Sequence, residues 1–317
     1  MTDRLKVCGT LALACILALA HPSATFAQSM TIVVPFAAGG TSDIAMRTIA
    51  SKVEELGGPR FLIENRPGGG GVTAAIGVRD AAPDGRTLFL ANYATFVVNP
   101  AMAATFPFDP SADFKPVTTL FSFPLMLAVP SNLEARSVAE LVALAKQKPG
   151  GLAYGLQGIG TAGHLLGELF AKGSGAPLVH VPYKGAAQGV VDLVAGRVDI
   201  MFIGVLPTKT HRASGALRAL GVASKTRMVE MPTVPTMQEA GYPDVNTDFV
   251  WFGLAAPAKT PDAVIKTLNE TFAKAAAASD VQQGVSVEAS TPAQFAARIK
   301  ADTAKFGPLI KASGAAK

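Results

Sequence analysis

Short apolar runs alternate with longer segments of helical period along the first third of the chain. The runs at residues 31–34, 61–63 and 87–90 are separated by helical-period segments at 42–56 and 72–82. Strands that alternate with helices in this way form a parallel sheet with helices on its faces. The pattern therefore predicts one α/β unit.

A second series of the same kind follows residue 131. Its helical-period segments and short apolar runs alternate in the order 137–148, 152–154, 161–172, 178–181, 185–195 and 200–203. Two separate α/β series predict two lobes, each built on a parallel-rich sheet.

Two further extended apolar segments, 124–130 and 249–256, lie on either side of the second series. We expect them to be crossing strands at a hinge, by which the chain leaves the first lobe and returns to it. The helical segments at 261–278 and 291–312 would then pack on the first lobe. Two lobes joined by two strands leave a cleft that can close around a ligand.

The first 27 residues have the layout of a secretory signal peptide. Arg4 and Lys6 precede an apolar run at 11–20, and the small residues around Phe26 predict cleavage after Ala27. The run is too short for a transmembrane span. A buried N-terminal helix is the alternative, although a Leu/Ala run without a polar face does not favour it. Export to the periplasm is expected, on the assumption of a Gram-negative source.

These features divide the chain into three parts. We expect a signal peptide at 1–27, a first lobe formed by 28–124 together with 252–317, and a second lobe at 125–251.

Composition narrows the class of protein. The chain has 317 residues, of which 49% are hydrophobic and only 16% charged, and this excludes a disordered chain or a coiled coil. Both cysteines, Cys8 and Cys15, lie in the predicted signal peptide, so thiol catalysis and cysteine–metal sites are not expected in the mature chain. Lipid attachment at Cys15 is disfavoured because the apolar run continues after it. The basic residues are scattered singly, so no nucleic-acid binding is expected.

A glycine-rich turn joins the first predicted strand to its helix. It contains Phe36 and the pair Gly39-Gly40, which allows the backbone to approach a ligand closely, and Thr41 or Ser42 could cap the helix. Unpaired N–H groups at a helix N-terminus point outward, and the helix dipole favours negative charge there. The turn is therefore a candidate carboxylate or phosphate site. An ordinary capped turn is the alternative.

The second lobe has a similar turn at 154–164. Gly158, Gly160 and Gly163 match the spacing of the dinucleotide fingerprint, but the next strand, 178–182, does not end in the acidic residue that would hold a ribose. We therefore expect a second anion site and no nucleotide cofactor.

Other turns follow strands at the same predicted edges. The segment 64–71 contains four consecutive glycines, Tyr93 and Thr95 follow the third strand, and Tyr183 follows a strand of the second lobe. Because ligands bind at the carboxyl ends of strands in open parallel sheets, these residues are candidates for the cleft. For Tyr183, a packed surface aromatic is an equal alternative.

The sequence gives little support for catalysis or a metal. His164 and Glu168 stand four apart on a predicted helix, but no HExxH pattern completes a metal site, and His180 and His211 lack ligand-like spacing. There is no G-x-S-x-G elbow and no cysteine nucleophile. Asp199 could pair locally with its neighbour Arg197. We expect no enzyme, no cofactor and no metal.

Taken together and in order, these motifs resemble the substrate-binding proteins of tripartite tricarboxylate transporters, the Bug family of periplasmic receptors. The matching segments are 32–43, 64–71, 99–100, 108–114, 154–165, 180–185, 196–199 and 235–241. The resemblance implies a two-lobed, type II-like periplasmic binding fold that traps a small organic acid. It also implies delivery of that acid to a permease made of a large and a small membrane subunit.

The resemblance further implies which loops hold the ligand. Backbone amides of the first-lobe turn hold one carboxylate in the family, and the glycine-rich turn of the second lobe contributes from the other side. By match, these roles fall to Ala38, Gly39, Gly40, Thr41 and Asp43 and to Gly158, Gly160, Thr161 and His164. The complete set of candidate ligand-binding residues adds Phe36, Tyr93, Thr95, Gln157, Tyr183 and Asp199.

One departure from the family bears on the ligand. Leu156-Gln157 stands where relatives usually carry small hydroxyl residues, so the pocket is expected to be more apolar there. That difference favours an aromatic or longer-chain acid over a compact, polar one.

The sequence thus predicts a monomeric, non-enzymatic receptor for a mono- or dicarboxylate, with only transient contact to membrane subunits. A sensor accessory that presents the ligand to a signalling receptor is one alternative. A periplasmic hydrolase or oxidoreductase built on the fingerprint-like glycines is the other.

Overall fold

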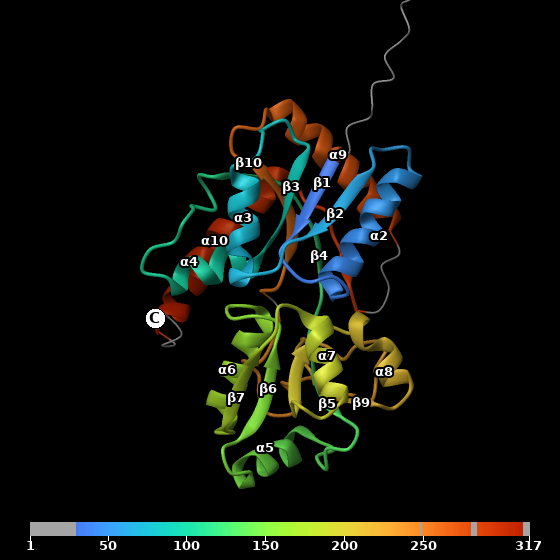
Figure 1. Ribbon diagram of the computed structural model, residues 1–317, viewed down its shortest axis with the longest axis vertical. Coiled ribbons are helices and arrows are strands. Elements are labelled where there is room, and N and C mark those ends of the chain that lie inside the picture. The colour runs from blue at the N-terminus through green and yellow to red at the C-terminus, as the bar shows by residue number, and fades with distance from the viewer. Residues whose placement is uncertain (1–29, 248, 280–283, 313–317) are drawn as a thin grey trace, which may run out of the picture.

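The computed structural model describes residues 30–247, 249–279 and 284–312, which form two α/β lobes arranged end to end (Figure 1). The predicted signal peptide, 1–27, lies outside the described residues. Within those ranges, no helix combines the length and the apolar character needed to cross a bilayer.

The first lobe is built on a six-stranded sheet in the order β11-β4-β10-β3-β1-β2. Its strands are β1 (Met30–Val34), β2 (Phe61–Asn65), β3 (Thr87–Asn92), β4 (Phe114–Ser122), β10 (Phe252–Pro257) and β11 (Ser286–Val287). Its helices are α2 (Thr41–Glu55), α3 (Val72–Arg79), α4 (Asn99–Met102), α9 (Asp262–Ala278) and α10 (Pro292–Ala312), with short turns η2 (Gly69–Gly71) and η3 (Ala94–Val98).

The second lobe is built on a five-stranded sheet in the order β7-β6-β8-β5-β9. Its strands are β5 (Met126–Pro130), β6 (Leu152–Leu156), β7 (Leu178–Pro182), β8 (Ile200–Ile203) and β9 (Leu217–Val222). Its helices are α5 (Val138–Gln147), α6 (Ala162–Ser174), α7 (Ala186–Val194) and α8 (Lys209–Ala213), with the short turn η4 (Leu206–Thr208).

Helices cover both faces of each sheet, which explains the continuous apolar runs in the sequence. In the first lobe α2 packs against α9, while α3, α4 and α10 lie on the other side of the sheet (Figure 1). In the second lobe alternate residues of one strand face opposite cores: Leu127 and Val129 join the core beneath α5 and α6, and Met126 and Ala128 join the core beneath α7. A strand buried on both faces loses the alternating pattern.

The predicted two-lobed α/β fold is confirmed, with one difference in the sheets. Each sheet is mixed: β1 pairs in parallel with β2 and β3, but β10 pairs antiparallel with both β3 and β4. In the first lobe the reason is that the chain returning from the second lobe inserts β10 between β3 and β4. In the second lobe β5, by which the chain enters, lies antiparallel between β8 and β9.

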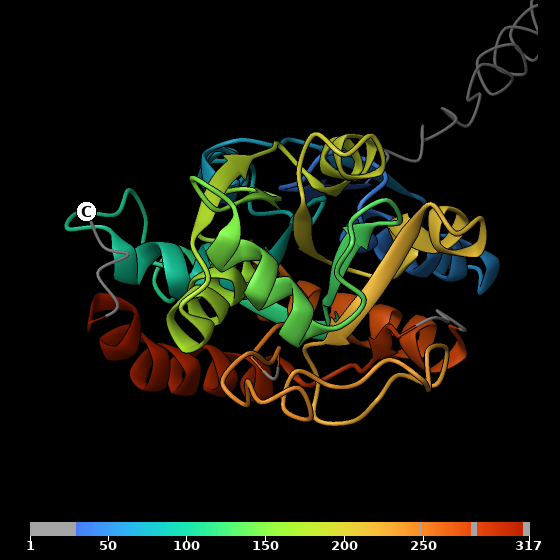
Figure 2. The same ribbon diagram turned by 90° about the horizontal axis from the view of Figure 1, so that it is seen from below.

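The two segments expected to cross between the lobes each belong to a single sheet. Among the described strands, β5 pairs with β8 and β9 and no other, and β10 with β3 and β4 and no other. The chain passes between the lobes just before each strand, at 123–125 and in the segment that ends at Trp251. The C-terminal helices α9 and α10 pack on β4 of the first lobe as predicted, along one side of the molecule (Figure 2).

Candidate functional site

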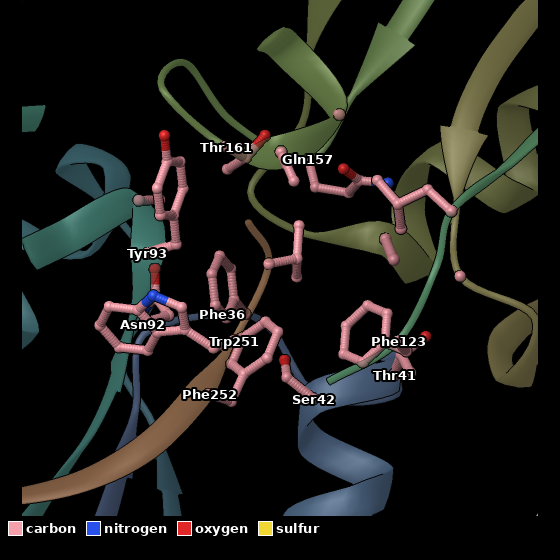
Figure 3. A pocket seen from close by; sticks show the side chains of 18 residues that line it. Phe36, Thr41, Ser42, Asn92, Tyr93, Phe123, Gln157, Thr161, Trp251 and Phe252 are labelled. Carbon is pink, nitrogen blue, oxygen red and sulfur yellow. The ribbon is translucent and has the colours of Figure 1, made fainter. Parts of the chain in front are cut away.

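A cavity lies between the lobes, where strands of both sheets end (Figure 3). β1 leads into Phe36, β3 ends at Asn92, β6 leads into Gln157 and β8 leads into Gly204, and all four residues line the cavity. The space not occupied by atoms is about 640 Å³, the open mouth included. The site therefore sits at the carboxyl ends of strands from both sheets, as in other open α/β sheets.

Three helices begin at this cavity. Thr41 starts α2 in the first lobe, and Ala162 and Ala186 start α6 and α7 in the second, and all three residues are in the cavity wall. The N-caps of α2 and α7 are Gly40 and Gly185, which have no side chain that could accept a hydrogen bond from the first-turn amides. First-turn amides and helix dipoles from both lobes thus face one space, an arrangement that favours an anion.

No charged side chain is found among the described residues that line the cavity. An anion bound here would therefore be held by backbone amides, dipoles and hydroxyl groups. The hydroxyls of Thr41, Ser42 and Tyr93 line the cavity, and their oxygens have no hydrogen-bond partner within the described part of the chain. Burial, with a smaller contribution from the charge of Asp302, raises the pKa of Tyr93, so its phenol is a neutral donor.

The remaining polar side chains of the wall are already engaged within their own lobes. The amide nitrogen of Gln157 donates to the carbonyl of Phe202 at 2.8 Å, and the side-chain oxygen of Asn92 accepts from the N–H of Thr95 at 3.2 Å. The polar groups left for a ligand are therefore few.

Aromatic rings form most of the rest of the wall. The rings of Phe123 and Phe252 lie nearly parallel, with centroids 5.0 Å apart and an angle of 14°, and Phe36 meets Phe252 edge-on at 6.3 Å and 66°. Phe36, Trp251 and Phe252 lie together, across the cavity from Thr161 and Gln157 (Figure 3). The cavity thus combines an anion-binding end with an aromatic body.

The structure brings many of the predicted site residues together. Those that line the cavity are Phe36, Gly40, Thr41, Tyr93, Gln157 and Thr161. Those that line an adjoining groove, which shares Phe36, Gln157 and Thr161 with the cavity, are Gly158, His164 and Tyr183. Those that line neither are Ala38, Gly39, Asp43, Thr95, Gly160 and Asp199.

Asp43 holds the first-lobe turn instead of facing the cavity. Its buried carboxylate accepts hydrogen bonds from the N–H of Gly39 at 2.9 Å, from the side-chain amide of Asn65 at 2.9 Å and from Nε of Arg47 at 3.1 Å. Burial opposes ionisation of this carboxyl, but the hydrogen bonds from Arg47, Gly39 and Asn65 outweigh it, and the pKa of Asp43 lies below its ordinary value. The carboxylate therefore fixes the turn in its ionised form.

Asp199 lies at the wrong end of its sheet to contact a ligand in the cavity. It precedes β8, whereas the cavity is at the carboxyl end of that strand. Its carboxylate accepts from Nζ of Lys148 at 2.6 Å and from the N–H of Ala153 at 2.7 Å. Asp199 thus ties the C-terminus of α5 to β6 in this structure, and its contact with a ligand stays a prediction.

Thr95 and Tyr183 direct their hydroxyls into their own lobes. The buried Thr95 donates to the carbonyl of Asn92 at 3.3 Å. Tyr183 donates to the carboxylate of Asp192 at 2.7 Å, and burial together with that hydrogen bond raises its pKa to about 12. Tyr183 can offer its ring to the groove, but its hydroxyl is occupied.

The two lobes touch around the cavity. The N–H of Ala37 donates to the carbonyl of Lys184 at 3.4 Å, and a Cβ added to Gly160 would lie 2.1 Å from the side-chain oxygen of Asn99 in the other lobe. Gly160 also has a backbone φ of +79°, a conformation that residues with a side chain rarely adopt. The second-lobe turn therefore requires glycine here for both reasons.

Three side chains in or beside the groove could in principle hold a metal ion. His164, Glu168 and His180 offer donor atoms that lie within 4.8 Å of one another. The N–H of Gly160 donates to Nδ1 of His164, so the proton of this neutral imidazole sits on Nε2, which faces Glu168 at 3.6 Å. A protonated nitrogen cannot ligate a metal, so this arrangement does not fit a cation. Burial lowers the pKa of His164, which keeps the ring neutral.

Phe123, Trp251 and Phe252 were not predicted as site residues. They belong to the segments expected to connect the lobes, or lie next to them. A segment that connects the two lobes must pass the cleft between them. Their place in or next to such segments is therefore the sequence signal that could have identified these three aromatic residues.

A family model described as "Tripartite tricarboxylate transporter family receptor" matches residues 45–315. The chain is 36% identical over 289 residues to the "UPF0065 protein in tcbD-tcbE intergenic region" of Pseudomonas sp. (strain P51). The matched region covers 89% of this chain and 85% of the relative.

Solved structures resemble the whole described fold. The periplasmic binding protein BugD has a TM-score of 0.85 at 29% identity, covering 91% of this chain and 98% of that chain. An R. palustris protein solved with adipate has a TM-score of 0.84 at 34% identity, covering 90% and 97%. MatC from Rhodopseudomonas palustris with bound malate has a TM-score of 0.82 at 28% identity, covering 89% and 98%.

Proposed function

The chain belongs to the tripartite tricarboxylate transporter family of receptors, and from this premise we propose that it captures a small organic acid, a mono- or dicarboxylate, between its lobes. The observation that carries the proposal is the convergence of the N-termini of α2, α6 and α7 on one cavity without charged side chains in its described lining. Such a site holds a carboxylate by amides and dipoles and does not require a counter-ion.

The relatives support an acid as the ligand. One R. palustris relative was solved with adipate and MatC with malate, and both ligands are carboxylates. Because the family consists of receptors, the chain is a solute-binding protein and not an enzyme.

Export and delivery form the finer part of the proposal. Members of the family are periplasmic receptors, and the predicted signal peptide with cleavage after Ala27 would bring this chain to the same compartment. There the monomer would hand its acid to the large and small membrane subunits of a tripartite transporter. The interlobe contacts of Ala37 and Gly160 support a closed form that such a partner could recognise.

The binding site can be tested by adding a negative charge where the acid is expected. Ala162→Asp places a carboxylate in the first turn of α6, where it suits the helix dipole but repels an anion in the cavity. Ala139→Asp is the matched control, because it adds the same charge to the first turn of α5, away from the cavity.

Thermal shift and calorimetry with adipate, malate, benzoate and neutral sugars give the readout. We expect at least one acid to stabilise the wild type and Ala139→Asp but not Ala162→Asp. If sugars stabilise the protein and no acid does, or if an acid binds Ala162→Asp as tightly as the wild type, the proposal is wrong. Delivery is tested by acid uptake in cells that carry the two membrane subunits, with and without this receptor.

A further inference from the structure

The two sides of the cavity differ in character, and this difference restricts the ligand. Phe36, Trp251 and Phe252 lie together on the first-lobe side, close to the free hydroxyl of Ser42 at the start of α2 (Figure 3). Across the cavity from these rings lie Gln157 and Thr161, the N-cap of α6 (Figure 3). A ligand that matches both parts has one charged end and an apolar body.

The rings of the wall are arranged to receive another ring. Phe123 and Phe252 lie nearly parallel in the wall, with centroids 5.0 Å apart at an angle of 14°, and the buried Phe121 supports both from outside the cavity at 6.4 and 5.1 Å. Phe36 stands edge-on to Phe252. Aromatic pairs gain energy from offset stacking and edge-to-face contact beyond the area they bury, and a flexible aliphatic chain cannot gain this contribution.

Trp251 adds ring surface without adding a free polar group. Its indole N–H donates to the carboxylate of Asp302 at 2.8 Å, which fixes the ring in the wall. Its polar atom is therefore already paired, and the carbon surface of the indole remains for the ligand.

A second carboxylate has no partner in this part of the cavity. The side-chain amide nitrogens of Asn92 and Gln157 donate to the carbonyls of Leu90 and Phe202 within their own lobes, and no charged side chain lines the described wall. The donors without a partner in the described wall are the neutral hydroxyls of Thr41, Ser42 and Tyr93. Burial of an unpaired carboxylate among aromatic rings is strongly unfavourable, whereas a ring hydroxyl would be accommodated.

Resting on the proposed function, we infer that the cavity prefers an aromatic monocarboxylic acid, with its carboxylate at the helix N-termini and its ring among Phe36, Phe123 and Phe252. Short aliphatic dicarboxylates are the disfavoured class, because the described wall of the cavity offers their second carboxylate no charged partner.

Calorimetry with benzoate, 4-hydroxybenzoate, succinate and adipate tests this preference. We expect benzoate and 4-hydroxybenzoate to bind at least about tenfold more tightly than succinate, which corresponds to about 1.4 kcal/mol. The fluorescence of Trp251, the single tryptophan of the chain, provides an independent signal from the cavity wall.

Substitutions in the wall distinguish ring contacts from the anion site. Phe36→Leu and Phe123→Leu should each weaken benzoate binding roughly fivefold, in line with the loss of one aromatic contact. Binding of adipate should change less. Phe106→Leu is the matched control, because Phe106 is half-buried and contacts Phe108 outside the cavity. Circular dichroism verifies that all three variants are folded.

The outcomes separate the inference from the proposed function. If succinate or adipate binds more tightly than both aromatic acids, the inference is wrong and the carboxylate receptor stands. An equal effect of Phe36→Leu and Phe123→Leu on benzoate and adipate would also overturn it. If no carboxylate binds the wild type, both proposals fail.

Discussion

The backbone N–H of Gly160 donates a hydrogen bond to Nδ1 of His164, with 3.2 Å between the two nitrogens. This bond ties the first turn of α6 to the glycine-rich turn that leads into it. Thr161 adds two bonds to the same turn, since its hydroxyl donates to the carbonyl of Gly158 at 2.7 Å and accepts from the N–H of His164 at 3.5 Å. His164 therefore positions the turn that lines the cavity.

Removal of the His164 acceptor should weaken both folding and binding. His164→Leu leaves the amide of Gly160 buried without a partner, which costs about 1–3 kcal/mol of unfolding free energy. His164→Asn, whose side-chain oxygen can take the position of Nδ1, should recover part of that loss. Urea unfolding and calorimetry with the tightest-binding acid of the panel provide the measurements. Equal behaviour of the two variants would show that the acceptor is unimportant.

Stability should fall as the pH is lowered through the ordinary titration range of histidine. Burial holds the pKa of His164 below its ordinary value of about 6.5, so the unfolded chain takes up this proton first. The contribution of the neutral His164 ring to the free energy of unfolding is complete above pH ~6.5. It decreases as the pH falls, and the decrease stops below the pKa of His164 in the folded state. Glu168 and His180 are the ionisable groups that face the ring. The decrease should be smaller in His164→Asn, and an identical pH profile for variant and wild type would contradict the assignment.

The sequence predicted most of the elements because their signals are local. A buried parallel strand and an amphipathic helix are each recognised within about ten residues, and the glycine turns follow the carboxyl ends of strands, where the cleft forms. Gly40, Thr41, Gln157 and Thr161 reach the cavity for this reason.

The roles that the structure gives to Asp43 and Asp199 depend on partners that are distant in the sequence. Asp43 is occupied by Asn65, 22 residues away, and Asp199 by Lys148, 51 residues away. The sequence pattern contains no signal for either pairing. Leu156 was expected to make the pocket apolar, but its side chain lies in the core of the second lobe, and the aromatic wall has that effect instead.

Asp43→Ala should destabilise the first-lobe turn and weaken ligand binding. The change removes a buried carboxylate that accepts three hydrogen bonds, and we expect a loss of roughly 2 kcal/mol. The half-exposed Arg47 contributes little as an ion pair in itself. Asp199→Ala is the matched control, since it also removes a carboxylate that binds a backbone N–H and a cation. It should reduce stability while leaving affinity unchanged, so weaker acid binding in Asp199→Ala would contradict the placement of the site.

The contribution of Asp43 should disappear in acid. Its pKa is lowered in the folded state, so its stabilisation is complete above the ordinary value of 3.8 and is lost as the pH falls through the lower folded value. The difference in unfolding free energy between wild type and Asp43→Ala should be constant between pH ~5, about one unit above the ordinary value, and pH ~7, and should shrink below pH ~4. Urea unfolding at several pH values measures it. A difference that grows in acid would show that the ionised form is not the stabilising one.

Closure of the lobes should depend on the absence of a side chain at Gly204. This residue follows β8 in the second lobe, and a Cβ added there would lie 2.1 Å from the hydroxyl oxygen of Thr41 and 3.1 Å from its Cβ in the first lobe. Gly204→Ala should therefore fold normally but populate the closed form less, which lowers the apparent affinity by roughly tenfold. Gly173→Ala, inside α6 with only an ordinary contact to Tyr242, is the matched control. Small-angle X-ray scattering with and without acid should show less compaction in Gly204→Ala than in Gly173→Ala, and equal compaction would mean that the lobes close without this contact.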